Sequence, residues 1–389
     1  MVTALTNGRI ILPERIATGT LVLQDGKIKN ISDHVPAGAE TIDCEGCYVS
    51  PGFIDMHSHG AGGADFMDST VDAFLTAARM HAKHGTTLLF PTTLASNTEG
   101  LMDSLSTYRT AKLENREGAA FGGMHLEGPY FSPKFAGAQD PRYIKNPDPS
   151  EYMKVLDNCP DIVRWSFAPE LEGAAEFAAE LRSRGIVASI GHTDATFGDC
   201  DRAYRAGATL MTHFYSCMST ISRRNAYRYA GTIEYGYWQD GMDIEIIADG
   251  VHVPSDLLKL LLKIKGSGRI SLVTDSMRAA GMPEGKYILG SLSDGQEVIV
   301  EDGVAKLPDR SAFAGSVATA DRLVRTMVRE AGCSISEAVM MISGNPARVM
   351  GLSDRKGSIE PGKDADIVVF DDNVNVVHTI VGGRKLELN

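Results

Sequence analysis

The sequence predicts an α/β protein in which a (β/α)8 barrel of the TIM type carries a small β-sandwich domain built from both ends of the chain. The middle of the chain alternates apolar, strand-like runs with helix-like segments, which is typical of such barrels. The two ends instead contain short strand-like runs separated by Asn-Gly and Asp-Gly turns. We therefore expect residues 51–351 to form the barrel, and residues 1–50 together with residues 352–389 to form the sandwich.

Neither end of the chain is long enough to make a stable β domain by itself. A small meander cannot bury both of its faces, so the two ends are expected to pair with each other. Their strand-like runs lie at residues 4–6, 9–12, 20–23, 27–31 and 40–43 near the N-terminus, and at residues 366–370 and 376–381 near the C-terminus.

The middle of the chain is expected to contain the eight barrel strands, which end near His57, Thr92, Glu127, Pro169, His192, His213, His252 and Asp275. Helical patterns cover residues 71–84, 174–184, 199–206 and 255–264. Residues 278–316 form a glycine-rich excursion with a predicted hairpin around residues 298–304, and helices are expected at 319–331 and 336–342. Active sites of such barrels lie at the C-terminal ends of the strands. Most of the predicted ends carry a residue that can bind a metal or transfer a proton.

Composition limits the classes of protein and of partner that fit this chain. The chain has 389 residues, a net charge of −12 and 43% hydrophobic residues, which is ordinary for a globular protein with a large core. The negative charge argues against nucleic acid or an anionic membrane as a partner. With no signal-type segment and no apolar run long enough for a spanning helix, the expected location is the cytoplasm. Cys44 and Cys47 have C-x-x-C spacing without a second pair, so they are interpreted as free or structural thiols.

Two histidines follow the first barrel strand. On a strand, His57 and His59 point to the same side, because successive side chains alternate. Two imidazoles on one face can hold one divalent ion. The alternative is a pair of core histidines, and the residues at later strand ends favour the metal site.

Three further strand ends provide a second set of possible metal ligands. Glu127 follows an apolar strand and precedes Gly-Pro, while His192 and His213 follow two later strands. Each of them alone could be a structural residue. Together they are one oxygen and two nitrogen ligands, which fits a catalytic zinc-type site with room for water. His125 shares the strand of Glu127 and is expected to support the ligands.

The last strand ends in a carboxylate, Asp275. An aspartate after so apolar a run is costly unless it is paired or functional. A carboxylate that faces an activated water can take its proton and later give it to a leaving amine. His252 could be a ligand, an oxyanion stabiliser or a substrate contact, and substrate contact is favoured. The basic segment 222–225 with Arg228 is either a solvated loop or a site for an anionic group, for which arginine is well suited.

Several motifs together resemble the amidohydrolase superfamily and, within it, the deacetylases of N-acetylated amino-sugar phosphates. The resemblance covers nearly the whole chain. The His-x-His pair is shared across the superfamily, whereas the motifs around Glu127 and His213 are more specific to the deacetylases. The motifs are PGFIDMHSHG at residues 51–60, HLEGP at 125–129, GHT at 191–193, THFY at 212–215, ADGVH at 248–252 and VTD at 273–275.

The resemblance implies a metal centre and a base. Glu127, His192 and His213 would be the main ligands, and His57 and His59 would be able to hold a second ion. The ion is expected to be zinc, with iron or manganese as alternatives, and one or two ions per subunit are compatible with the motifs. Asp275 would act as general base and acid.

The resemblance also implies a substrate site and a homodimer. Arg224, reaching across from a second subunit, and His252 would hold the phosphate. Segments 137–139 and 314–316 would line the sugar pocket, with Gly137, Ala138, Gln139, Ala314, Gly315 and Ser316. Two departures leave the sugar epimer open: Ser216-Cys217 stands where relatives often have Asn-Ala, and Gln139 where some have histidine.

The expected reaction is hydrolysis of the acetamide of N-acetylglucosamine 6-phosphate, with the metal and Gln139 or His252 stabilising the oxyanion. One alternative is a related N-acyl sugar phosphate, such as N-acetylgalactosamine 6-phosphate. Hydrolysis of a cyclic amide is disfavoured, because the fourth strand, residues 162–169, has no lysine to be carboxylated. An inactive barrel that serves as a scaffold or sugar-phosphate sensor is disfavoured too, since every expected ligand and the base are present.

Overall fold

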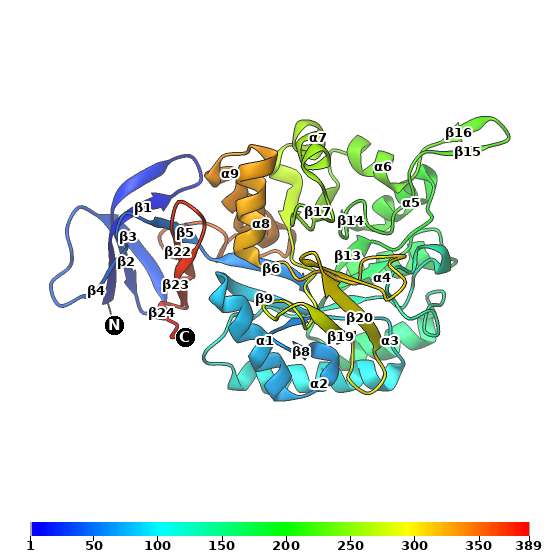
Figure 1. Cartoon of the computed structure of the whole chain (residues 1–389), viewed down its shortest axis with the longest axis horizontal. Helices are drawn as coiled ribbons and strands as arrows, with labels where there is room; N and C mark the ends of the chain where they lie inside the picture. Colours follow the sequence, from blue (N-terminus) through cyan, green and yellow to red (C-terminus); the bar gives the residue numbers. More distant parts are fainter. Residues whose placement is uncertain (1, 389) are drawn as a thin grey trace.

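The computed structural model describes residues 2–388, and its centre is a barrel of parallel strands (Figure 1). The strands neighbour one another in chain order, and the short strand β10 (Ala120–Phe121) adds to the side of β9. The barrel strands are β6 (Phe53–Ser58), β9 (Thr86–Thr93), β11 (Met124–Glu127), β12 (Ile162–Phe167), β13 (Val187–Ile190), β14 (Ala208–Met211), β17 (Asp243–Ile246) and β18 (Ile270–Leu272).

The barrel closes between its last and first strands. The backbone N–H of Asp275 donates to the carbonyl of His57 at 2.9 Å, and Ser58 forms a parallel bridge with Ser276. The predicted (β/α)8 barrel is therefore present. One strand end differs from the prediction: β17 ends at Ile246, so His252 lies in the loop that follows it.

Helices surround the barrel on its outside (Figure 1). Helix α1 illustrates why these segments form helices that pack on the barrel. Thr70 caps the N-terminus of α1 by accepting a hydrogen bond from the N–H of Ala73, and the buried face of α1 is made of small and aromatic residues such as Phe74 and Ala77. The major helices are α1 (Val71–Lys83), α2 (Thr98–Glu114), α3 (Pro149–Asn158), α4 (Ala174–Ser183), α5 (Phe197–Ala206), α6 (Thr232–Trp238) and α7 (Ser255–Lys265).

The predicted helices are confirmed, with two of them interrupted. The helix expected at 319–331 is α8 (Ala320–Thr326) followed by the π-helical turn η4 (Met327–Ala331). The helix expected at 336–342 is α9 (Ile335–Val339) continued by η5 (Met340–Gly344) and α10 (Asn345–Val349). Short 3-10 turns are η1 (Phe66–Asp68), η2 (Pro133–Phe135) and η3 (Ser267–Arg269).

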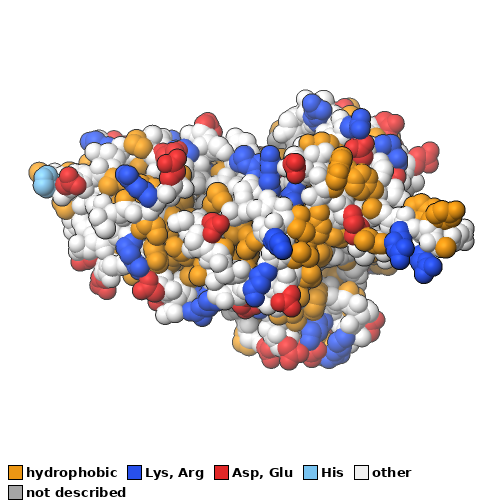
Figure 2. All heavy atoms as spheres, turned by 90° about the horizontal axis from the view of Figure 1, so that it is seen from above, with side chains coloured by type: hydrophobic (Ala, Val, Ile, Leu, Met, Phe, Trp, Pro, Cys, Tyr) orange, Lys and Arg blue, Asp and Glu red, His pale blue; other side chains and the backbone are white. Residues whose placement is uncertain are grey.

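Small β elements extend from the loops after the barrel strands. The glycine-rich excursion folds into a three-stranded sheet of β19 (Gly285–Leu289), β20 (Gln296–Glu301) and β21 (Val304–Lys306), which contains the predicted hairpin. Strands β7 (Gly60–Ala61) and β8 (Ala64–Asp65) form a short pair after β6. The hairpin of β15 (Ser222–Arg224) and β16 (Tyr227–Tyr229) projects from the barrel (Figure 1), and Figure 2 shows hydrophobic and basic side chains at this tip.

Strands from both ends of the chain share one eight-stranded sheet beside the barrel. Strand β22 (Ile367–Phe370) pairs antiparallel with β5 (Tyr48–Pro51), and one apolar cluster includes Leu21, Val49 and Ile380. The other strands are β1 (Val2–Ile11), β2 (Ile16–Gln24), β3 (Lys27–Ser32), β4 (Glu40–Asp43), β23 (Val376–Val381) and β24 (Arg384–Lys385). Across residues 2–388, the helices are all too short or too polar to cross a membrane.

Candidate metal centre

The first cluster of metal-binding side chains joins three neighbouring strand ends. Glu127 ends β11, and His192 and His213 follow β13 and β14. Glu127 Oε1 lies 3.2 Å from His192 Nε2 and 3.0 Å from His213 Nε2. All three side chains are buried, and their ligand atoms lie within 4.8 Å of one another. The structure therefore brings together the three residues that the sequence singled out.

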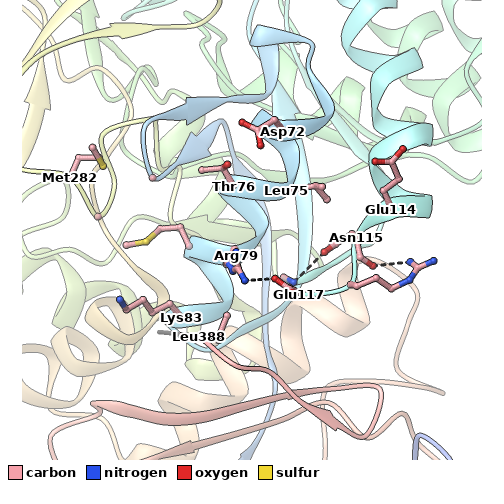
Figure 3. Close-up of a pocket in the computed structure, with 15 residues that line it drawn as sticks. Asp72, Leu75, Thr76, Arg79, Lys83, Glu114, Asn115, Glu117, Met282 and Leu388 are labelled. Atoms are coloured by element: carbon pink, nitrogen blue, oxygen red, sulfur yellow. Dashed lines mark hydrogen bonds and ion pairs between the residues drawn. The ribbon is translucent and has the colours of Figure 1, made fainter.

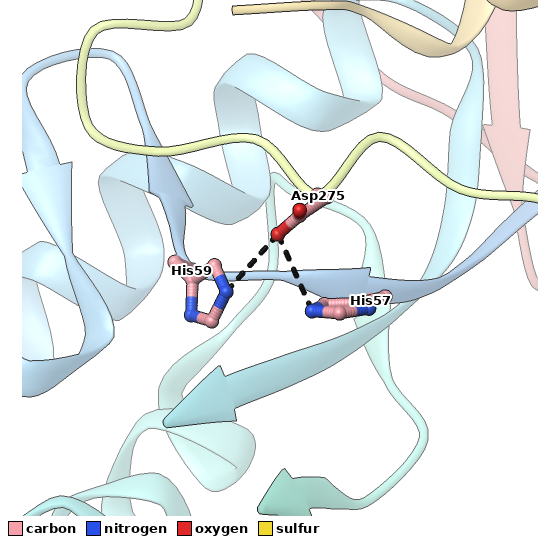
Figure 4. Close-up of side chains that lie close together, drawn as sticks. All are labelled: His57, His59 and Asp275. Atoms are coloured by element: carbon pink, nitrogen blue, oxygen red, sulfur yellow. Dashed lines mark ion pairs between the residues drawn. The ribbon is translucent and has the colours of Figure 1, made fainter. Parts of the chain in front are cut away.

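The second cluster lies where the barrel closes. His57, at the end of β6, and His59, just beyond it, both face Asp275 from the loop after β18 (Figure 4). Asp275 Oδ1 lies 3.3 Å from His57 Nε2 and 3.1 Å from His59 Nε2. As strand alternation predicts, the two imidazoles point to the same side.

Glu127 connects the two clusters. Its Oε1 faces His192 and His213, whereas its Oε2 lies 3.2 Å from His59 Nε2. His57 Nε2 is 3.6 Å from Glu127 Oε1. The six side chains thus form one continuous centre, in which a single carboxylate is positioned between two sets of ligands.

Two of the imidazoles are oriented by groups that only accept hydrogen bonds. His192 Nδ1 lies 3.0 Å from the carbonyl of Phe135, and His57 Nδ1 lies 2.7 Å from Glu245 Oε1. In each ring Nδ1 therefore carries a hydrogen, and this bond directs Nε2 toward the centre.

The donor set and its unpaired atoms fit a divalent metal ion. Among the residues that the structure describes, His57 Nε2 and Asp275 Oδ1 are buried without a hydrogen-bond partner. Such atoms are costly in a protein interior unless a ligand uses them. Imidazole nitrogens with carboxylate oxygens suit zinc, and also iron or manganese.

The charges at the centre favour a cation in the same place. Burial lowers the pKa of His57, but the carboxylates of Asp275, Glu245 and Glu127 outweigh it and raise that pKa to about 9. Burial lowers the pKa of His59 too, but the adjacent carboxylates of Asp275 and Glu127 outweigh it and raise that pKa to about 10. Burial raises the pKa of Asp275, yet the two imidazoles hold it below its usual value. The carboxylates therefore stay ionised and attract positive charge.

A pocket of about 230 Å³ opens onto both clusters. Most residues predicted to contact a substrate line it: Ala138, Gln139, Ser216, Cys217, His252 and Gly315. Phe313, Leu94 and Leu289 also line it and were missed, because apolar loop residues carry no sequence signal for a site. Ala314 and Ser316 are fully buried, and the N–H of Ser316 donates to the carbonyl of Asp275 at 2.7 Å, so Ser316 supports the loop of the carboxylate.

Gln139 and His252 are both held by protein groups. Gln139 Oε1 accepts from the N–H of Ala95 at 2.8 Å, and its Nε2 donates to Glu127 Oε2 at 2.7 Å. Gln139 therefore orients Glu127. His252 Nδ1 lies 2.8 Å from Asp249 Oδ2, and its ring packs against Phe313 at 4.5 Å.

Arg224 lies outside this pocket within the single chain. It is exposed on β15, in the hairpin that projects from the barrel, beside the exposed Tyr227 and Arg228. Its guanidinium lies over the ring of Tyr229, 5.6 Å from the centroid. The arginine that the sequence assigned to the phosphate thus extends away from its own barrel.

Two charged residues beneath the centre were missed in the sequence. Arg164 on β12 and Glu245 on β17 are fully buried and paired at 2.6 Å. Each is a charged residue with an apolar residue on either side in a buried strand, which is a signal that could have identified them. His125, predicted as a supporting residue, lies 2.7 Å from Ser166 Oγ, and its ring packs against His57 at 4.6 Å.

A larger cavity, of about 740 Å³, lies elsewhere on the surface (Figure 3). It is formed by α1 and residues 114–118, and its walls include the ion pair of Arg79 with Glu117. Neither metal-binding cluster lines it. The smaller pocket is therefore the candidate site.

Comparison with known proteins defines the class of the chain. Residues 48–386 match the Amidohydrolase family, and the chain belongs to that family. It is similar to N-acetylglucosamine-6-phosphate deacetylases from Bacillus subtilis, at 34% identity over 95% of this chain and 93% of the relative, and from Danio rerio, at 30% identity over 99% and 96%. It is also similar to an N-acetylgalactosamine-6-phosphate deacetylase from Escherichia coli O157:H7, at 32% identity over 94% and 93%.

Solved structures agree with this assignment. The N-acetylglucosamine-6-phosphate deacetylase from Pasteurella multocida superposes with a TM-score of 0.92 at 30% identity, covering 99% of both chains. The N-acetyl-D-glucosamine-6-phosphate deacetylase from Mycobacterium smegmatis superposes with a TM-score of 0.89 at 31% identity, covering 100% of both chains. The fold is thus that of the amidohydrolases, with deacetylases among the similar structures.

Proposed function

We propose that this chain is an enzyme that hydrolyses the acetamide of N-acetylglucosamine 6-phosphate and releases acetate and glucosamine 6-phosphate. The observation that carries the proposal is the continuous centre of Glu127, His57, His59, His192, His213 and Asp275, all of which line the pocket except His57. The deacetylases among the relatives supply the substrate class.

In this proposal the centre would hold two zinc ions. Glu127, His192 and His213 would hold the first, and His57 and His59 would provide the second position, with Glu127 facing both. When bound, zinc lowers the pKa of a coordinated water and polarises the carbonyl of the amide. Iron or manganese would satisfy the same donor set.

Asp275 is the proposed base and acid. His57 and His59 outweigh burial and keep the pKa of this carboxyl below its usual value, so it is ionised at neutral pH. It takes a proton from the attacking water as the new C–O bond forms. It then returns that proton to the amine nitrogen as the C–N bond breaks, which balances the reaction.

The remaining pocket residues are proposed to bind the amino-sugar phosphate. His252, oriented by Asp249, contacts the substrate, and Ala138, Gly315, Ser216 and Cys217 surround the sugar. Gln139 acts through Glu127, to which its amide is bound, while Ala314 and Ser316 support the pocket wall.

The proposed enzyme is a homodimer in which Arg224 of one subunit contacts the phosphate bound by the other. Two features support this: the hairpin projects from its own barrel (Figure 1), and its exposed Tyr227 and Arg224 can contact both an apolar surface and an anion. Neither nucleic acid nor a membrane is a proposed partner. A cytoplasmic location is part of the proposal, because a charged sugar phosphate does not cross a membrane unaided.

The proposed domain division follows the sequence analysis. Residues 1–50 and 352–389 form a β-sandwich, and residues 51–351 form the barrel. The apolar cluster that draws on strands from both ends, from Leu5 to Ile380, supports a separate core for the small domain.

A second candidate substrate is N-acetylgalactosamine 6-phosphate. The relative from Escherichia coli O157:H7 is named as a deacetylase of this compound. Ser216 and Cys217 lie in the pocket where the sugar would be recognised. The two epimers differ at one hydroxyl group. A site that hydrogen-bonds that hydroxyl discriminates strongly against a sugar in which it is misplaced.

Acetate release by the purified, zinc-loaded chain tests both candidates. We expect turnover with N-acetylglucosamine 6-phosphate, a lower kcat/KM with the galactosamine epimer, and a much lower one with unphosphorylated N-acetylglucosamine. A higher kcat/KM for the galactosamine epimer would replace the first candidate by the second. Absence of acetate from all three compounds, with zinc bound, would refute the deacetylase function.

A further inference from the structure

A buried ion pair lies directly beneath the metal centre. Arg164 Nη1 on β12 donates to Glu245 Oε2 on β17 at 2.6 Å, and both side chains are fully buried. Because arginine does not lose its proton in a protein, its charge has to be matched within the barrel. The carboxylate of Glu245 provides that match.

The second oxygen of Glu245 reaches the metal centre. Glu245 Oε1 lies 2.7 Å from His57 Nδ1 and accepts from the backbone N–H of His213 at 3.0 Å. One carboxylate thus contacts a residue of each cluster. Because Nδ1 of His57 is held in this way, its Nε2 faces Asp275 and Glu127.

The guanidinium of Arg164 is fixed by several strands. It donates to the carbonyl of Met56 at 3.1 Å, to Thr212 Oγ1 at 3.1 Å and to Ser189 Oγ at 3.2 Å. These bonds reach β6, β13 and the residue that follows β14, in addition to β17. The planar guanidinium can satisfy all of them at once, so Glu245 has little freedom to turn away from His57.

The pair also balances its own charge. An unmatched carboxylate at Glu245 would place a buried negative charge in contact with His57. Arg164 cancels that negative charge while leaving Oε1 as a hydrogen-bond acceptor. Orientation is thus provided without an additional net charge at the centre.

We propose that the Arg164–Glu245 pair positions His57 as a metal ligand and so determines whether the His57/His59 position retains its ion. The pair is a positioning device, since neither residue lines the pocket among the residues that the structure describes. The inference rests on the metal centre of the proposed function, and its test measures zinc rather than turnover.

The test compares zinc binding in variants of the full chain. Glu245→Gln removes the charge with little change of shape, and Arg164→Met combined with Glu245→Leu replaces the whole pair by apolar side chains, which a buried pair often tolerates. The measurements are zinc per chain by mass spectrometry after dialysis, and zinc affinity by competition with a chromophoric chelator. We expect one of two zinc ions to be weakened by roughly 10–100-fold and the other to be retained.

Asp243 provides a matched control. It lies two residues before Glu245 at the start of the same strand, is buried, and its carboxylate pairs with Arg348 at 2.7 Å rather than with a residue of the centre. Asp243→Asn is expected to lower the melting temperature without changing zinc binding. His57→Asn completes a double-mutant cycle, in which adding Glu245→Gln to it is expected to have no further effect on zinc affinity.

The outcomes are distinct. Folded variants that bind two zinc ions with unchanged affinity would overturn the inference, as would equal zinc loss in Asp243→Asn. A wild-type chain that binds only one zinc would overturn it as well. If the wild type binds two ions but releases no acetate, the proposed function fails while the inference is still decided by the zinc affinities.

Discussion

Buried and half-buried carboxylates have different partners in two regions of the molecule. One region is the small sheet formed by the two ends of the chain, and the other is the C-terminal face of the barrel. In the sheet region, Asp364 is matched by permanent cations, with Lys27 at 2.5 Å and Arg355 at 3.0 Å. At the barrel face, Glu127 and Asp275 are buried among imidazoles, whose charge depends on pH, and Asp275 Oδ1 has no hydrogen-bond partner among the described residues.

This difference indicates that the charged residues of the sheet contribute to stability, whereas those of the barrel face serve the function. Ion pairs near the surface cost little desolvation and contribute modestly to folding. Buried carboxylates with unused oxygens are costly, so a fold retains them where a ligand offsets the cost. Changes at the barrel face should therefore abolish activity with little loss of the fold, whereas changes in the sheet should do the reverse.

Removal of the metal is expected to have the largest effect. A chelator should abolish acetate release, because the polarising ion is lost, and zinc should restore it. Thermal unfolding should also shift, since a ligand at 100 times its Kd stabilises the folded state by about 2.7 kcal/mol. Full activity in a protein shown by mass spectrometry to be free of metal would contradict the assignment of the barrel face.

Asp275→Asn is expected to reduce kcat by roughly 100- to 10,000-fold, because the amide cannot accept a proton from water. Zinc content should be measured in the same sample and should persist through the other ligands. Asp364→Asn is the control from the sheet and should leave kcat unchanged. A kcat near the wild-type value for Asp275→Asn would exclude this residue as the base.

Arg224→Ala is expected to have an intermediate effect. Loss of a charge-assisted hydrogen bond of about 1.5–3 kcal/mol corresponds to roughly a 10- to 100-fold rise in KM for the phosphorylated substrate. Arg228→Ala, from the next strand of the same hairpin, is the matched control.

Mixing two impaired proteins tests whether Arg224 acts across subunits. A hybrid of Arg224→Ala and Asp275→Asn subunits contains one site with both native residues, so activity should return on mixing. No recovery in a mixture shown to form hybrids would exclude a contribution from the partner subunit.

The smallest effect, a change in stability, is expected for the substitution of Asp364 in the sheet. Burial raises the pKa of Asp364, but hydrogen bonds to Lys27 and Lys356 outweigh it and lower that pKa to about 2. Its contribution to stability is therefore complete above its unfolded value of 3.8 and is lost as the pH falls toward 2. Because the partners lie near the surface, we expect about 1 kcal/mol or less. Urea unfolding of Asp364→Asn and wild type should differ at pH 6 and converge at pH 2, and a constant difference would contradict this.

Much of the fold and of the centre could be predicted because the signals are local. A strand presents alternate residues to one side, so His57 and His59 identify a shared face wherever the strand lies in the barrel. Parallel strands bring their C-terminal ends together, so Glu127, His192 and His213 could be grouped before any contact was known.

Other features depended on the register and closure of the barrel. Arg164 and Glu245 are far apart in the sequence and lie on strands that do not pair with each other, so only the closed barrel brings the two charges together beside His57. The same holds for Gln139, which contacts Glu127 because its loop folds back over β11.

The sequence by itself determined the order of strands and helices and the residues able to bind a metal, because periodicity and residue chemistry are properties of short segments. The tertiary structure alone decided which of these side chains touch, which are only supporting, and that Arg224 extends away from its own barrel. Contacts between distant segments depend on packing, and packing is a property of the whole chain.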